Sequence, residues 1–184
     1  MPDHEEPRSS VSRISNILGL DPGSRQAGYA LARFEGDRLV DVSFGVWRVR
    51  SRKDRAVGLA SLHEQVEEWL SSSRPDAAAI EGLFHHRNVR SALALAEARG
   101  VVLSLLGRHA IPVAEYPPAT VKKTICGDGG ADKAQVRLAL VRTVPVLRRF
   151  QLDDIPADAT DALAVAICHQ MHARVQRLAT GPSR

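Results

Sequence analysis

The chain has 184 residues, 44% of them hydrophobic, and a formal net charge of +4. This length and composition are typical of one compact domain with a buried core, and the basic balance suits a polyanionic partner without requiring one. Neither Cys126 nor Cys168 has the spacing of a zinc site or redox pair, and no run approaches the roughly 18 apolar residues of a membrane helix. We therefore expect a soluble, cytoplasmic protein.

The first half of the chain predicts strands. Residues 1–16 are polar and predict a disordered tail before a single domain over residues 17–174, with a second tail over 175–184. The apolar residues 16–20 end in Asp-Pro-Gly-Ser, which indicates a buried strand that enters a tight turn. Residues 28–34 and 39–49 predict two further strands, so the economical arrangement is three consecutive antiparallel strands.

Helices and strands alternate after residue 55. Apolar residues at helical spacing predict a helix that Pro75 ends, and a short strand follows to Glu81. A helix with many small residues covers 89–108, and a strand covers 112–116. Further helices begin at Pro117-Pro118, after the capping residue Asp132, and near Asp158. The pattern predicts an α/β fold with a mixed sheet between helices.

Four carboxylates stand out from this pattern. Asp21 and Glu81 end buried strands, and Asp158 and Asp161 lie at i and i+3 on one helical face. Because buried charges are costly unless they are paired or bound to a cation, convergence of these acids predicts a site for Mg²⁺ or Mn²⁺. Each also has a structural interpretation: Asp-Pro-Gly is common turn chemistry, and Asp158 with Asp161 can cap a helix.

Several motifs in order resemble the RuvC-type Holliday-junction resolvases. They are ILGLDPGSRQAG (17–28), AIEGLF (79–84), ARG (98–100) and ADATDALA (157–164), and the similarity runs from about residue 17 to residue 170. The resemblance implies a ribonuclease-H-like fold with a mixed five-stranded sheet, three antiparallel strands first, between helices on both faces. It also implies a homodimer that resolves four-way DNA junctions by paired, magnesium-dependent incisions, together with a branch-migration motor complex.

The family's acidic tetrad matches Asp21, Glu81, Asp158 and Asp161. The resemblance implies two metal ions bridged by Asp21, with Mn²⁺ able to replace Mg²⁺, and hydrolysis to 5′-phosphate and 3′-hydroxyl ends.

Matching positions also imply contacts with DNA. Lys122 and Lys133 would lie near the scissile phosphate, Phe84 would stack on an unpaired base, and Arg87 would contact DNA. The structural alternatives are solvated lysines, which we prefer for Lys123, and a phenylalanine that anchors its loop. Other candidates for the DNA face are Arg25, Arg90, Arg99 and Arg108. The helix over 89–108 is the candidate dimer interface.

Three other functions compete with this hypothesis. An actin-like kinase or ATPase would share the first phosphate loop, but the chain is short for two lobes and has no second glycine-rich loop. An inactive junction-binding scaffold is disfavoured by the intact acidic set. A related nuclease acting on RNA or transposon ends is disfavoured only through the resemblance.

Overall fold

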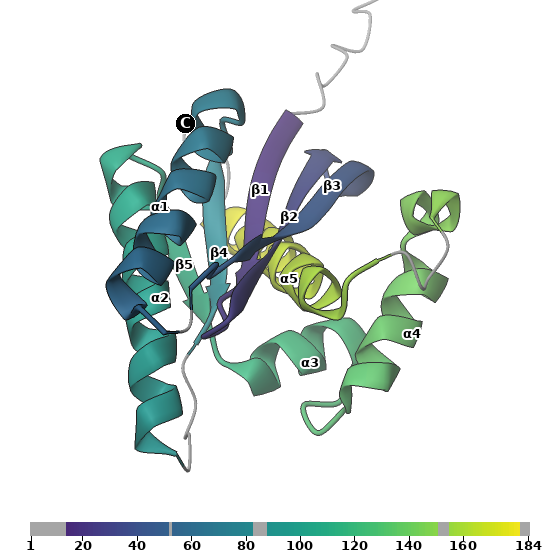
Figure 1. The fold of residues 1–184 in the computed structure, drawn as a ribbon. Coiled ribbons are helices and arrows are strands. Elements are labelled where there is room, and N and C mark those ends of the chain that lie inside the picture. The colour runs from purple at the N-terminus through teal and green to yellow at the C-terminus, as the bar shows by residue number, and fades with distance from the viewer. Residues whose placement is uncertain (1–13, 52, 83–87, 151–154, 181–184) are drawn as a thin grey trace, which may run out of the picture.

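A computed structural model describes residues 14–51, 53–82, 88–150 and 155–180. Its centre is a five-stranded sheet of order β3-β2-β1-β4-β5 (Figure 1). The strands are β1 (Ile14–Asp21), β2 (Gln26–Glu35), β3 (Arg38–Arg48), β4 (Ala77–Glu81) and β5 (Val113–Tyr116). The first three are antiparallel neighbours, whereas β4 runs parallel to β1 and β5 parallel to β4. The predicted mixed sheet is confirmed.

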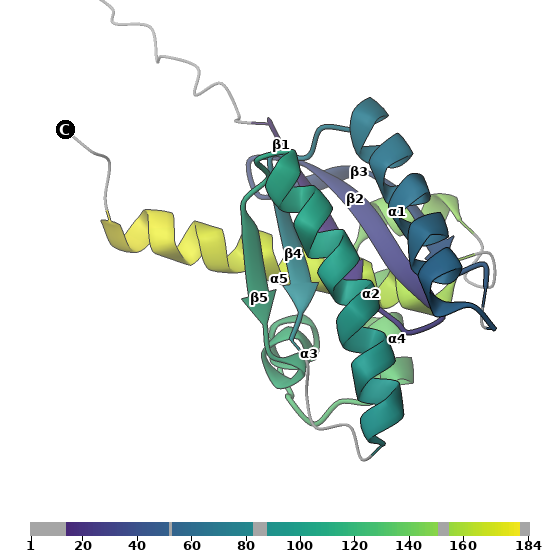
Figure 2. The same ribbon diagram turned by 60° about the vertical axis from the view of Figure 1, so that its left-hand side comes forward.

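Helices cover both faces of this sheet, as predicted (Figures 1 and 2). They are α1 (Arg55–Ser72), α2 (Val89–Arg108), α3 (Pro118–Cys126), α4 (Lys133–Thr143) and α5 (Ala157–Thr180), with a 3-10 turn η1 (Pro145–Arg149). Alternation along β1 divides the core. Leu18 and Leu20 pack in the cluster that includes α1 and α2, and Ile17 packs in the cluster that includes α5.

Capping residues set where several helices begin. The side chain of Asp54 accepts a hydrogen bond from the backbone N–H of Val57 at the start of α1. At the start of α4, Asp132 and Gln135 form a reciprocal capping box, which satisfies backbone donors that the first turn leaves unpaired. Helix α3 ends at Cys126 and is capped by Gly127, which has a φ of 77°, a conformation that glycine adopts without steric cost.

Both ends of the ordered domain extend beyond the predicted limits. Strand β1 begins at Ile14, which pairs with Glu35, so residues 14–16 belong to the sheet and not to a tail. The long β2 supplies backbone partners there whatever the side chains are. Helix α5 continues past residue 174 to Thr180, with no glycine or proline before Gly181. Within the described ranges, every helix is too short or too polar to cross a bilayer.

Candidate active site

The acidic residues meet at one edge of the sheet. Asp21 ends β1 and Glu81 ends β4, and because these neighbouring strands are parallel, both carboxylates leave the sheet at the same edge. Asp158 and Asp161 lie at the start of α5. Carboxylate oxygens of Asp21, Asp158 and Asp161 all lie within 4.8 Å of one another. Glu81 stands outside this group of three.

Two glycines bring α5 close enough to the strands. A Cβ at Gly28, which pairs with Asp21 across β1 and β2, would lie 2.2 Å from the carbonyl oxygen of Asp158. A Cβ at Gly19 would lie 1.9 Å from the carbonyl oxygen of Ala162. Only a residue without a side chain permits such approach, so these positions fix the distance between the strand and helix halves of the site.

Burial and mutual repulsion perturb the titration of the strand-end acids. Burial raises the pKa of Asp21 from 3.8 to about 7, and the nearby Asp161 and Glu81 carboxylates add to the rise. Burial also raises the pKa of Glu81, with a further contribution from Asp161. A cation among these oxygens would relieve the repulsion. The donor set, all carboxylate oxygen, fits a hard divalent ion such as Mg²⁺ or Mn²⁺.

Two lysines border the acids. The Lys133 ammonium donates to Oδ2 of Asp161, and this bond raises the pKa of Lys133. Lys122 on α3 is close enough to oppose the rise in the pKa of Glu81. Lys123 is exposed, in accord with the solvated interpretation. Positive charge therefore lies beside the carboxylates from two separate helices.

Comparison with known proteins places this arrangement in a family. Residues 17–169 match the family model described as "Crossover junction endodeoxyribonuclease RuvC". The chain belongs to the RuvC family. RuvC proteins named as crossover junction endodeoxyribonucleases are similar to it: that of Myxococcus xanthus is 44% identical over 86% of this chain and 81% of the relative. That of Sorangium cellulosum is 41% identical over 83% of each chain.

Solved RuvC structures share the fold. Thermus thermophilus RuvC in complex with a Holliday junction substrate superposes with a TM-score of 0.76 at 28% identity, over 88% of this chain and 96% of that one. The yeast mitochondrial Holliday junction resolvase Ydc2 gives a TM-score of 0.61 over 91% of this chain and 83% of that one. At 15% identity, the second likeness concerns the fold alone.

In this RuvC family member Arg99, one of several candidates for the DNA face, is buried instead. Its side chain on α2 is 7% exposed. It donates to the backbone carbonyl of Glu81 at 2.8 Å and to Glu115 Oε2 at 2.6 Å. Arg99 therefore holds the end of β4 from which Glu81 projects. Arg99 belongs to the ARG motif (98–100), but the charge of its side chain alone suggested a position on the surface.

The interpretation of Asp158 as a helix cap is also wrong. The helix begins at Ala157, Asp158 lies inside the first turn, and the backbone carbonyl of Pro156 accepts the bond from the N–H of Thr160. The Asp158 carboxylate instead accepts a hydrogen bond from the side-chain amide of Gln26 on β2. Sequence reasoning did not single out Gln26, which lies between the turn after Asp21 and the apolar part of β2.

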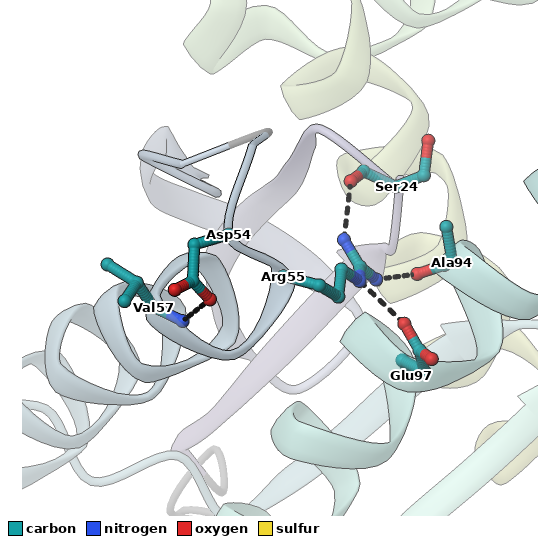
Figure 3. Close-up of polar contacts among 6 residues, drawn as sticks. All are labelled: Ser24, Asp54, Arg55, Val57, Ala94 and Glu97. Carbon is teal, nitrogen blue, oxygen red and sulfur yellow. Dashed lines mark hydrogen bonds and ion pairs between the residues drawn. The ribbon is translucent and has the colours of Figure 1, made fainter.

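The loop that follows Asp21 is tied to the helices on the opposite face. Arg55, at the start of α1, donates to the carbonyl of Ser24 at 3.4 Å, to Glu97 at 2.5 Å and to the carbonyl of Ala94 (Figure 3). Asp54 beside it caps α1 (Figure 3). One guanidinium thus joins the loop to both α1 and α2. Phe84 and Arg87, the other expected DNA contacts, lie outside the described residues.

Proposed function

We propose that this chain resolves four-way (Holliday) DNA junctions in recombination and repair by paired, metal-dependent phosphodiester hydrolysis that leaves 5′-phosphate and 3′-hydroxyl ends. The observation that carries the proposal is the convergence of oxygens from Asp21, Asp158 and Asp161 within 4.8 Å at the sheet edge. Membership of a family named for crossover junction endodeoxyribonucleases supports the reaction. The structure of a relative with a Holliday junction substrate supports the choice of DNA.

We assign the acids to a magnesium site. Asp21 is coupled electrostatically to Asp158, Asp161 and Glu81, which suits a central carboxylate that contacts two ions, with the other acids completing the coordination. When bound, Mg²⁺ or Mn²⁺ would supply an activated water and neutralise charge on the leaving 3′ oxygen. The carboxylates would hold and orient the ions, and none of them needs to attack the phosphorus atom.

Lys133 and Lys122 border the acids from α4 and α3. Lys133 holds Asp161, and its positive charge, with that of Lys122, lies where a scissile phosphate would meet the acids. Positive groups fixed before the reaction stabilise the charge that develops on the phosphoryl oxygens. Together with Phe84 and Arg87 these lysines form the proposed DNA contacts.

A junction has two-fold symmetry, so paired incisions need two copies of the site. We therefore propose a homodimer through α2, on which Val89 and Leu93 are 73% and 60% exposed while its other face packs on the sheet. We further propose that the protein acts on DNA in the cytoplasm, together with a branch-migration motor complex.

The direct test is incubation of the purified protein with a synthetic mobile four-way junction, with and without Mg²⁺, beside a linear duplex of the same sequence. We expect symmetric nicks on the junction only, dependent on the metal, and ligatable products. Cutting of the duplex at an equal rate, or cutting that persists in excess chelator, would reject the assignment.

A further inference from the structure

A two-residue relay joins the acidic group to the edge strand β3. Nε2 of Gln26 on β2 donates to Oδ2 of Asp158 at 2.5 Å. Oε1 of Gln26 accepts a hydrogen bond from Nη1 of Arg48 at 3.3 Å. Gln26 and Arg48 are directly opposed in the register of β2 and β3, so the pairing of the two strands brings the two side chains together.

The partners fix which way the Gln26 amide points. A guanidinium only donates hydrogen bonds, and an ionised carboxylate only accepts them. The amide oxygen must therefore face Arg48 and the amide nitrogen must face Asp158. The opposite orientation would lose both bonds and set oxygen against oxygen.

Arg48 is in turn held from a third direction. The Gln65 side chain on α1 accepts from the backbone N–H of Arg48 at 3.0 Å and donates to its carbonyl at 2.8 Å. The relay thus runs from α1 through β3 and β2 to the first turn of α5. These contacts connect a helix on one face of the sheet to a helix on the other, and they end on a carboxylate of the acidic group.

The two α5 acids have partners of different charge. Asp161 is held by the Lys133 ammonium, a cation that offsets its negative charge. Asp158 is held by a neutral amide, which restricts rotation of the carboxylate without forming an ion pair with it. Partners of this kind set the orientation of metal ligands, and their loss typically costs about 10- to 100-fold in metal affinity.

We propose that Gln26 is a positioning residue for divalent-cation binding: it holds the Asp158 carboxylate toward Asp21 and Asp161, and Arg48 keeps the Gln26 amide in the required orientation. The inference rests on the proposed metal site and deepens it. It assigns to residues on β2 and β3 a role in cation affinity that is separate from contact with DNA.

The test uses the full chain and Mn²⁺ as the probe, with binding measured by calorimetry in the absence of DNA. Gln26→Met keeps the length of the side chain and removes the amide nitrogen and oxygen, so we expect the Kd for Mn²⁺ to rise about tenfold or more. Arg48→Met should raise it by a smaller factor, and Arg48→Lys, which can still donate to Oε1, should restore most of the affinity. Arg38→Met, at the other end of β3, is the matched control and should leave it unchanged.

Cleavage then provides the second measurement. For Gln26→Met we expect the half-saturating Mg²⁺ concentration to rise by a similar factor, while the rate at saturating Mg²⁺ stays within a few-fold of wild type. Thermal unfolding in chelator, compared with Arg38→Met, separates positioning from loss of fold.

The outcomes distinguish the two proposals. Wild-type Mn²⁺ affinity in Gln26→Met, or an affinity loss matched by an equal loss in Arg38→Met, overturns the role of Gln26 even if junctions are cut. A wild-type protein that binds no Mn²⁺ overturns it as well. If the wild type binds Mn²⁺ and Gln26→Met weakens that binding, but junctions are left uncut, the positioning role stands and the proposed function fails.

Discussion

The two ends of the sheet treat carboxylates in opposite ways. At the end distant from the site, Glu35, Asp37 and Asp41 each have an arginine partner, at 3.1, 3.1 and 2.7 Å. The hydrogen bond from Arg149 lowers the pKa of Asp41. At the other end, Asp21 faces further acids, and its pKa is raised to about 7. Asp21 therefore lies among excess negative charge at the acidic end, which a bound cation would offset.

Asp21→Asn is expected to have the largest effect of the changes considered. The amide cannot supply the anionic oxygen between the other acids, so we expect cleavage to fall by about a thousandfold or more, while junction binding in Ca²⁺ is retained. Rates come from single-turnover cleavage and binding from gel mobility. Asp41→Asn, the same change at the paired end, should leave cleavage unaltered. Retained cutting in Asp21→Asn would refute the site.

The pH dependence of stability should differ between the ends. Because the folded-state pKa of Asp21 lies above 3.8, the folded protein binds more protons than the unfolded chain between about pH 4 and 7. The free energy of unfolding in chelator should therefore fall as pH rises through that window, on the order of 4 kcal/mol, and level off above pH 7. Urea denaturation at several pH values measures this.

Asp41 should contribute with the opposite sign, because its pKa is lowered. Its stabilisation is present above its unfolded pKa and is lost as pH falls through the folded value. Asp21→Asn should flatten the fall toward pH 7, whereas Asp41→Asn should preserve it. A wild-type profile in Asp21→Asn would show that other groups cause the slope.

Arginine removal should also separate the two ends. Arg99→Met takes away a guanidinium that is 7% exposed and leaves the carbonyl of Glu81 without its donor, so we expect a loss of about 2 kcal/mol in the free energy of unfolding. Arg38 is 76% exposed and is paired with Glu35. Arg38→Met should therefore lower the free energy of unfolding by less than about 0.5 kcal/mol. Chemical denaturation at pH 7 measures both free energies of unfolding, and equal losses in the two variants would contradict the assigned role of Arg99.

The smallest expected effect concerns Lys133. Lys133→Ala removes the cation beside Asp161, so we expect a roughly tenfold slower cutting rate with little change in junction affinity. The pKa of Asp21 should rise further, because Lys133 lowers it. The exposed Lys123 on α3 supplies the control as Lys123→Ala. Wild-type turnover in Lys133→Ala would remove this lysine from the site.

Much of the fold could be predicted because local chemistry marks its boundaries. The helix predicted over 89–108 has those limits in the structure, and Asp132 caps α4 as expected. The start of β1 was predicted two residues late, because Ile14 and Ser15 follow a polar stretch and join the sheet through backbone pairing with β2. The last turns of α5 were assigned to a tail although Met171, Val175 and Leu178 keep helical spacing, and these side chains are exposed in the structure.

The acids of the site were readable because charge at the end of a buried strand is unusual. Their supporting residues were not. Gln26 meets Arg48 only because the β2–β3 hairpin has one particular register, and a shift of one residue would turn the two side chains to opposite faces. Arg99 was misassigned because its burial depends on how α2 packs across the end of β4. Sequence patterns indicate the period of an element, but not the pairing between elements.

Gly28 allows the start of α5 to pack closely against β2. A Cβ there would lie 2.2 Å from the Asp158 carbonyl oxygen, so any side chain would push the start of α5 away from β2. Together with Gly19, the absence of a side chain at Gly28 thus sets the distance between the strand carboxylates and those of α5. Gly28→Ala would therefore separate the strand carboxylates from those of α5, and we expect such a variant to bind a junction without cutting it.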